Sequence, residues 1–255
     1  MRMRHSSGAG SPGAAGASKG AYAAQRGFEP CASCASRKFS VCAPVAESEL
    51  PHFFAMSARL RIEPRQPLLN KGDPAEHVFS IARGAVSIAK ALPDGRRQIT
   101  GFLFDGDFVG LTHGDTCAYT AEALTVVEVC RFPRARFEAY LAEHSHVERR
   151  LLQIASTELA AAQDQMLLLG RKTAVERLAS FLLRLSDRAV LHARPGNPIA
   201  LPMTRSEMAD YLGLTIETIS RTITQLRKMG AIELDGLHQV RMTSEETLRR
   251  VAESA

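Results

Sequence analysis

The sequence has no long hydrophobic run. None of its apolar stretches approaches the roughly 20 residues that cross a bilayer, so we predict no membrane partner. The first residues also lack the apolar block of a secretion signal and contain no Asp or Glu. Residues 1–28, rich in Gly, Ser and Ala, are expected to form a disordered tail, with a transit peptide as the less favoured alternative.

Cysteine is scarce, with five residues: Cys31, Cys34, Cys42, Cys117 and Cys130. An odd number without a signal peptide argues against the disulfide framework of a secreted protein. The first three lie within a dozen residues. In a reducing compartment such a group is more often metal-binding or redox-active than structural.

The composition is that of an ordinary globular protein. The chain has 255 residues, 45% of them hydrophobic and 23% charged, which is enough for two domains with separate cores. Its net charge of +5 fits a polyanionic partner but is weak evidence by itself.

Residues 66–132 consist of short apolar runs separated by turn signals such as Pro93-Asp94-Gly95 and Asp105-Gly106-Asp107. This spacing predicts a β-sandwich or small barrel. A short amphipathic helix is expected before it, over residues 47–61, ended by Pro64.

A helical period begins near Val147 and continues to Gly170, with a stripe that includes Leu151, Ile154, Leu159 and Met166. The stripe extends farther than one small barrel could cover. Pairing with a second copy is therefore favoured over burial within the chain. A second helix is expected over residues 173–187.

The segment from Thr204 to Met229 predicts a helix-turn-helix. Thr204 and Glu207 form a capping box, and Gly213 supplies the turn. Thr215, with Thr218 in the third position, begins a second helix that runs to Met229. Residues 231–242 are expected to form a hairpin wing.

The second helix has two faces. Four residues make its predicted buried stripe: Ile216, Ile219, Ile223 and Leu226. The other face presents Glu217, Ser220 and Arg221. Glu217 can accept a hydrogen bond from cytosine, Ser220 can contact several base edges and Arg221 can donate two hydrogen bonds to guanine. Four residues are expected to contact DNA phosphates: Thr204, Arg205, Thr215 and Thr218. The alternative is a helical hairpin with a polar face.

Residues 212–221 (Leu-Gly-Leu-Thr-Ile-Glu-Thr-Ile-Ser-Arg) resemble the recognition helix of the FNR branch of the CRP/FNR family. The similarity runs from about Cys31 to Thr243 and includes Gly72-Asp73, residues 106–110, 167–172 and 176–179. The resemblance implies an α+β chain: the tail, a cysteine segment and cupin-like β-roll over 29–146, a dimerisation helix over 147–171 and a winged helix-turn-helix over 172–255.

The resemblance also implies a function. It suggests a bacterial cytoplasmic regulator, not an enzyme, that binds inverted repeats of TTGAT half-sites as a homodimer. Glu217, Ser220 and Arg221 would read each half-site. Such proteins activate or repress transcription by contacting RNA polymerase.

Cyclic nucleotide binding is not expected. Cyclic-AMP-binding members carry a Gly-Glu pair and an Arg-Ser pair for the phosphate. Here the corresponding positions hold Gly110-Leu111 and Cys117-Ala118. Leu and Cys provide no cationic cradle for a phosphate.

The cysteines are the better candidates for a sensor. FNR-type oxygen sensors hold a [4Fe-4S] cluster with three N-terminal cysteines and one distant cysteine. The resemblance assigns Cys31, Cys34, Cys42 and, in the Val-Cys-x-x-Pro setting of residues 129–133, Cys130. Oxygen would destroy the cluster, weaken the dimer and release DNA. Asp164 matches an acidic position that opposes pairing of the apo protein; the alternative is an ordinary solvated side chain.

Other interpretations stay open. The cysteines could hold structural zinc, or act as metal-free redox thiols in a FixK-like variant. Cys117 is expected to be an ordinary strand residue. A cupin-type enzyme or ligand-binding module using His77, His113, His144 and His146 is a remote alternative, because the last two fall at a helix start.

Overall fold

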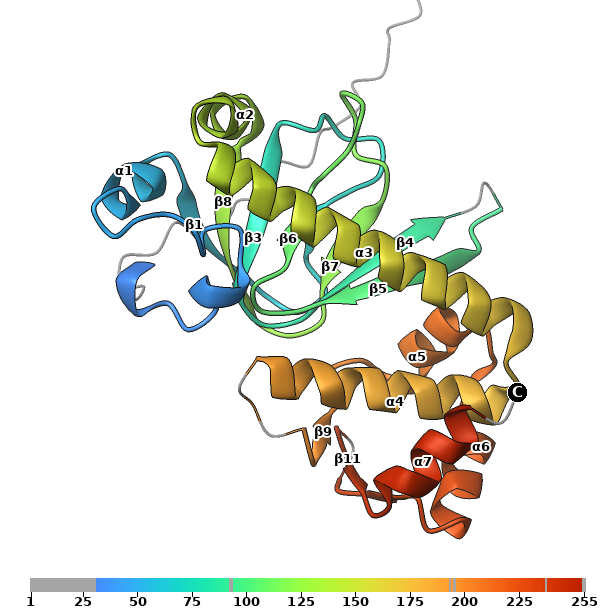
Figure 1. Cartoon of the computed structure of the whole chain (residues 1–255). Helices are drawn as coiled ribbons and strands as arrows, with labels where there is room; N and C mark the ends of the chain where they lie inside the picture. The colour runs from blue at the N-terminus through green and yellow to red at the C-terminus, as the bar shows by residue number, and fades with distance from the viewer. Residues whose placement is uncertain (1–30, 92–93, 193, 195, 237, 254–255) are drawn as a thin grey trace, which may run out of the picture.

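The computed structural model describes residues 31–91, 94–192, 194, 196–236 and 238–253. The predicted tail, residues 1–28, lies outside this part. The described chain is α+β, with a strand-rich N-terminal part, one long helix and a helix-rich C-terminal part below the strands (Figure 1). None of the described helices is long and apolar enough to span a membrane.

The elements follow one another in a simple order. The helical elements are η1 Cys31–Ser33, η2 Arg37–Phe39, α1 Leu50–Ala55, α2 Arg134–Glu143, α3 Ser145–Arg171, α4 Ala174–Leu191, α5 Arg205–Leu212, α6 Ile216–Lys228 and α7 Glu245–Ala252. The strands are β1 Ala58–Ile62, β2 Pro67–Leu69, β3 His77–Arg83, β4 Val86–Ala91, β5 Arg97–Leu103, β6 Phe108–Val109, β7 Thr120–Ala123, β8 Val127–Pro133, β9 Ile199–Ala200, β10 Ile232–Leu234 and β11 Gln239–Met242.

Two antiparallel four-stranded sheets form the predicted β-roll. Their strand orders are β1-β8-β3-β6 and β2-β7-β4-β5. Alternate side chains of the sheets meet in one apolar core that includes Leu60, Ile81, Val86 and Val127. Cys117 lies in this core with 8% of its surface exposed, but the prediction of a strand residue is wrong, because Cys117 lies three residues before β7.

The helix predicted over residues 47–61 is wrong beyond Ala55. After α1, residues 58–62 form β1, which pairs with β8. Leu60 and Ile62 are buried while Arg61 is exposed, so the segment alternates with period two. Pairing with β8 and burial of these two side chains override the local helical pattern.

Helix α3 runs from α2 along the β-roll to the C-terminal part (Figure 1). Its predicted stripe divides in two. Leu151 and Ile154 are half-buried and pack against the apolar cluster of their own chain that contains Phe53 and Phe137, so their place in the pairing surface stays a prediction. Leu159 and Met166 stay exposed, together with Leu152, which sequence reasoning left out; their exposed fractions are 61%, 69% and 62%.

These three residues, Leu152, Leu159 and Met166, recur every seven positions, and we call them the α3 seam. A seven-residue apolar repeat on an exposed helix is typical of a coiled-coil contact.

The C-terminal part packs α4 to α7 and the sheet β10-β11-β9 around a second core. This core contains Leu178, Phe181, Leu212 and Leu226. It also includes Ile99 from β5, which is 1% exposed. A strand of the β-roll therefore contributes to the core of the other part.

Candidate functional site

Helices α5 and α6 form the predicted helix-turn-helix. Thr204 begins α5 with a capping box: its hydroxyl accepts from the Glu207 backbone N–H at 3.2 Å, and Glu207 accepts from the Thr204 N–H at 2.7 Å. Gly213 has φ of 62°, in the left-handed region that a helix end favours. Thr215 then begins α6 by accepting from the Thr218 N–H at 3.2 Å.

One face of α6 is buried at Ile219, Ile223 and Leu226, as predicted. The prediction is wrong for Ile216, which remains 46% exposed in the first turn. An apolar side chain therefore lies at the edge of the polar face, where it could contact a thymine methyl group.

The opposite face of α6 presents the predicted triplet. Glu217 and Arg221 are exposed, and Ser220 is half-buried. The pKa of Glu217 is lowered, because its own backbone N–H and then the Thr215 hydroxyl bond its carboxylate. The face therefore offers an ionised acceptor, a hydroxyl and a guanidinium within two helical turns.

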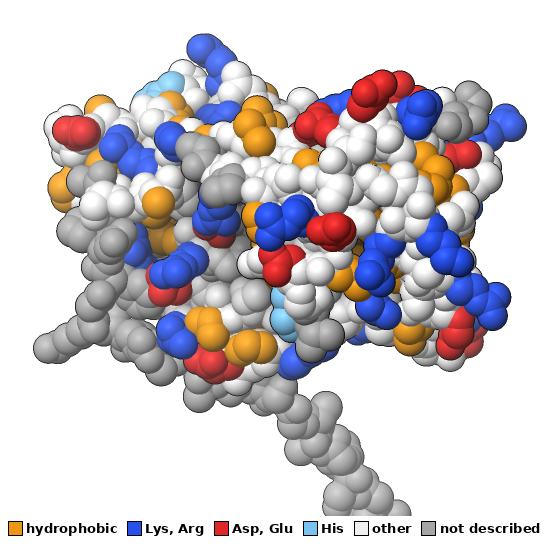
Figure 2. Space-filling view, turned by 90° about the horizontal axis from the view of Figure 1, so that it is seen from below, with side chains coloured by type: hydrophobic (Ala, Val, Ile, Leu, Met, Phe, Trp, Pro, Cys, Tyr) orange, Lys and Arg blue, Asp and Glu red, His pale blue; other side chains and the backbone are white. Residues whose placement is uncertain are grey.

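Arg205 contacts this face directly. Its Nη1 donates to Ser220 Oγ at 3.2 Å, which joins the start of α5 to the middle of α6. Arg227 and Lys228 are exposed near the end of α6. Figure 2 views the molecule from below and shows Lys and Arg side chains interspersed with Asp and Glu side chains. The exposed cations of Arg205, Arg227 and Lys228 beside the α6 face are suited to a phosphate backbone.

The N-cap of α6 gives a stability prediction. Thr215→Ala should lower the free energy of unfolding by about 1 kcal/mol, because the Thr218 N–H loses its acceptor. Urea unfolding measures the change. Thr224→Ala is the matched control, since this exposed hydroxyl only bonds the Ser220 carbonyl within the helix. Equal losses in both variants would contradict the capping role.

Four of the five cysteines share one region. Cys31, Cys42 and Cys130 pack against the same apolar cluster, which includes Phe53 and Phe132. Arg59 lies beside Cys130 on the neighbouring strand and donates to Cys31 Sγ at 3.8 Å. Ionisation of Cys31, Cys42 or Cys34 would raise the pKa of Cys130, so the four thiols are close enough to interact electrostatically. The fold thus brings β8 to the N-terminal cysteine segment.

Burial raises the pKa of the Cys130 thiol to about 12 and also raises the pKa of Cys31 and of Cys42. These thiols are protonated at neutral pH, so a metal that binds them must displace protons. Among the described residues, no group of three or more Cys, His, Asp or Glu is close enough to hold one metal ion.

Two kinds of metal site use four thiolates. Structural zinc sites bind four cysteines within about 2.3 Å of a single ion, and four-iron clusters are also held by four cysteines. The donor set of Cys31, Cys34, Cys42 and Cys130 fits both groups chemically.

The cysteine segment contacts both other parts of the chain, which the sequence did not predict. From α3, Arg150 donates through Nε to the Ser40 carbonyl at 3.2 Å and through Nη2 to the Phe39 carbonyl. The Phe39 ring stacks on His192 at the end of α4, with ring centroids 4.1 Å apart. The segment is therefore in contact with α3 and with α4.

Comparisons with known proteins agree with the strand-rich part followed by a helix-turn-helix. Residues 59–144 match the model of the cyclic nucleotide-binding domain, and residues 176–251 match that of the Crp-like helix-turn-helix domain. The nitrogen fixation regulation protein FixK of Bradyrhizobium diazoefficiens is 38% identical over 204 residues, which are 80% of this chain and 86% of FixK. The chain belongs to the CRP/FNR family of transcription regulators.

Other CRP/FNR members are equally similar. The transcriptional activator protein FnrL of Cereibacter sphaeroides is 40% identical over 217 residues, 84% of this chain and 88% of FnrL. The solved structure of FixK2 from Bradyrhizobium japonicum matches with a TM-score of 0.72 at 36% identity, covering 78% of this chain and 98% of that one. The protein is thus a DNA-binding transcription regulator of the FNR and FixK type, and its relatives are regulators, not enzymes.

Proposed function

We propose that this regulator is an oxygen-responsive homodimer, active in the bacterial cytoplasm when oxygen is low. The observation that carries the proposal is the thiol group: Cys31 and Cys42 of one short segment pack with Cys130 of β8 against one apolar cluster, and Cys34 of the same segment interacts electrostatically with Cys130. These four residues would hold a [4Fe-4S] cluster, which supplies an oxygen-labile group when bound. No cyclic nucleotide is needed, since Leu111 and the buried Cys117 offer no phosphate cradle.

The chain's own residues would carry the signal to the dimer contact. The cysteine segment is bonded to α3 through Arg150, and α3 exposes its apolar seam. When the cysteine segment is held in one conformation by the cluster, it would favour the orientation of α3 in which α3 pairs with a second copy. Asp164 is exposed on α3, but two positions before Met166 it lies on the side of the helix away from the seam. Pairing along the seam would therefore not bring two Asp164 carboxylates together, and the opposing role of Asp164 rests on the resemblance alone.

Each α6 would then read one half of an inverted repeat of TTGAT-like sites. Arg221 would donate two N–H groups to guanine O6 and N7. Glu217 would accept from a cytosine amino group, and Ser220 would bond a base edge. Thr204, Arg205, Thr215 and Thr218, at the starts of α5 and α6, bond the phosphates. Bound in this way, the dimer activates or represses transcription through contacts with RNA polymerase.

Arg221→Ala tests the reading mode. We expect the variant to lose about 1–3 kcal/mol of affinity on the TTGAT repeat, because a bidentate guanine contact disappears. Binding should also become indifferent to one base pair of each half-site. Fluorescence anisotropy on a set of single-base variants of the repeat measures both effects.

Arg227→Ala is the matched control on the same helix. Arg227 is exposed near the end of α6, so its loss should weaken all sequences alike. If Arg221→Ala also weakened every sequence equally, Arg221 would be a phosphate contact and the proposed reading mode would fail.

Metal analysis separates the cluster from its competitors. Protein purified without oxygen should contain iron and sulfide and lose them in air. Zinc, with DNA binding insensitive to air, would favour the structural-metal alternative. Neither metal, after anaerobic reconstitution, would leave metal-free redox thiols as the remaining alternative.

A further inference from the structure

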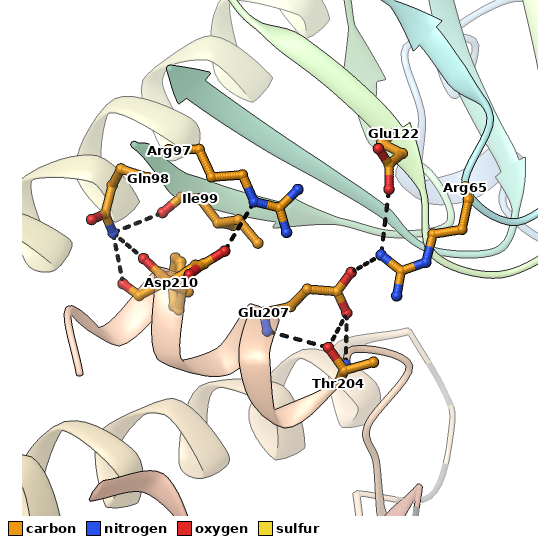
Figure 3. Close-up of polar contacts among 9 residues, drawn as sticks. Arg65, Arg97, Gln98, Ile99, Glu122, Thr204, Glu207 and Asp210 are labelled. Carbon is orange, nitrogen blue, oxygen red and sulfur yellow. Dashed lines mark hydrogen bonds and ion pairs between the residues drawn. The ribbon is translucent and has the colours of Figure 1, made fainter. Parts of the chain in front are cut away.

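An ion pair joins the β-roll to the first helix of the helix-turn-helix (Figure 3). Arg65 Nη1 donates to Glu207 Oε1 at 2.7 Å and to Glu122 Oε1 at 3.5 Å. The Glu207 side chain is only 3% exposed and also holds the Thr204 cap. The contact is therefore stronger than an ordinary surface pair, because one partner is shielded from water.

The backbone of Arg65 is unusual. Among the described residues it is the one residue other than glycine with a positive φ, 71°. A side chain in this region is strained, and the surrounding structure must hold it there. The ion pair with Glu207 is one contact of Arg65 in this conformation.

A second contact lies at the other end of α5 (Figure 3). Arg97 Nε donates to Asp210 Oδ2 at 3.0 Å. Gln98 Nε2 donates to the carbonyls of Asp210 and Tyr211, the second at 3.3 Å. Both donors come from β5, so one strand holds the end of α5.

The Tyr211 carbonyl also joins α5 to α3. It accepts from Gln165 Nε2 at 2.8 Å, and Gln165, which is 7% exposed, is held in turn by Arg184 at 3.1 Å. The same carbonyl thus receives bonds from the β-roll and from the helix that carries the seam.

Apolar contacts support these polar ones. The Phe102 ring of β5 lies 5.0 Å from the Tyr211 ring and 6.0 Å from that of Phe181. Ile99 is buried in the core of the C-terminal part. Helix α5 therefore packs against β5 through apolar side chains, and side chains of the β-roll form ion pairs near both of its ends.

We propose that Arg65, Arg97 and Gln98 are positioning residues for DNA recognition, which hold α5 at one angle and so set the half-site spacing that the dimer accepts. Helix α6 follows α5 after a three-residue turn, so the angle of α5 determines the direction of α6. The seam on α3 sets the dimer axis, and Gln165 relates α5 to that axis. The inference rests on the proposed dimeric binding to inverted repeats.

Spacing dependence is the direct test. Full-length protein, prepared without oxygen, is titrated by anisotropy with DNA whose two half-sites stand at the preferred separation or are moved by one, two or three base pairs. Wild-type protein should prefer one separation. The variants Arg65→Asn and Arg97→Ala/Gln98→Ala should reduce that preference by about tenfold. Helix-turn-helix units that are no longer held at one angle by the β-roll can bind half-sites at other separations. Asn tolerates positive φ, so Arg65→Asn removes the charge without adding backbone strain.

Two further variants make the test specific. Arg96→Ala is the matched control, since Arg96 is a neighbour on the same hairpin but pairs with Asp94 at 2.8 Å; it should keep the wild-type spacing preference. The exchange Arg97→Asp with Asp210→Arg should restore the preference lost in Arg97→Asp alone.

The outcomes separate two failures. Variants that keep the wild-type preference, or that weaken binding equally at every separation, would overturn the positioning role. A wild-type protein that binds DNA without any spacing preference would overturn the proposed dimeric reading mode itself.

Discussion

Cys130→Ser should abolish cluster assembly and, with it, oxygen control of DNA binding. Cys130 is the ligand that β8 would contribute, and it lies beside Arg59 in the apolar region shared with Cys31 and Cys42. Serine is a hard oxygen donor and a poor substitute for a soft thiolate on iron. We expect iron to fall from about four per protomer to background after anaerobic reconstitution.

Two measurements read out this change. Iron and sulfide analysis reports the cluster, and anisotropy on the inverted repeat, with and without air, reports the DNA response. The wild type should bind tightly only without oxygen. Cys130→Ser should bind weakly under both conditions, because the segment bonded to Arg150 would no longer be ordered by the cluster.

Cys117→Ser is the control that the chain itself offers. Cys117 is a cysteine of the same β-roll but lies in the core between the sheets, away from the thiol group. This variant should cost about 1 kcal/mol of stability for a buried hydroxyl while keeping its iron and its oxygen response. Iron loss in Cys117→Ser, or full iron in Cys130→Ser, would show that the ligand set is wrong.

Leu159→Glu should separate the dimer into protomers. Leu159 is the middle residue of the α3 seam and 61% exposed in the single chain. A carboxylate there would face its own copy across paired helices in an apolar contact, where an unpaired charge is costly. Affinity for the full inverted repeat should fall by at least about 100-fold, since two linked helix-turn-helix units bind DNA far more tightly than one unit.

Sedimentation of the anaerobic protein measures the state of assembly. Leu191→Glu is the control: Leu191 is even more exposed, at 74%, but lies at the end of α4. It should leave both mass and DNA affinity unchanged. A dimer that persists in Leu159→Glu would show that the seam is not the contact.

Local signals in the sequence predicted much of the C-terminal part. The capping box at Thr204, the turn at Gly213 and the cap at Thr215 depend on neighbours three or four residues away. Such patterns can be read directly from the chain. The α1–β1 region could not be read in this way, because residues 58–62 become a strand only when β8 lies beside them.

The thiol group could be predicted from the sequence only in part. The spacing of Cys31, Cys34 and Cys42 marks a site, and the resemblance to the FNR branch added Cys130. No local sequence pattern predicted that Arg59 lies beside Cys130, or that Arg150 and His192 contact the cysteine segment. These contacts join distant parts of the chain, and nothing in the residue types alone pairs them.

The sequence by itself determined the family and the caps and turn of the helix-turn-helix, because each depends on residue type and short spacing. It also predicted Glu217, Ser220 and Arg221 as the reading triplet. Only the tertiary structure decided which side of α3 is free. Leu151 and Leu152 are neighbours of equal hydrophobicity, yet one packs against its own chain and the other faces outward. The contact of Arg65 with Glu207, 142 positions away, likewise arises only when the β-roll and α5 are packed together.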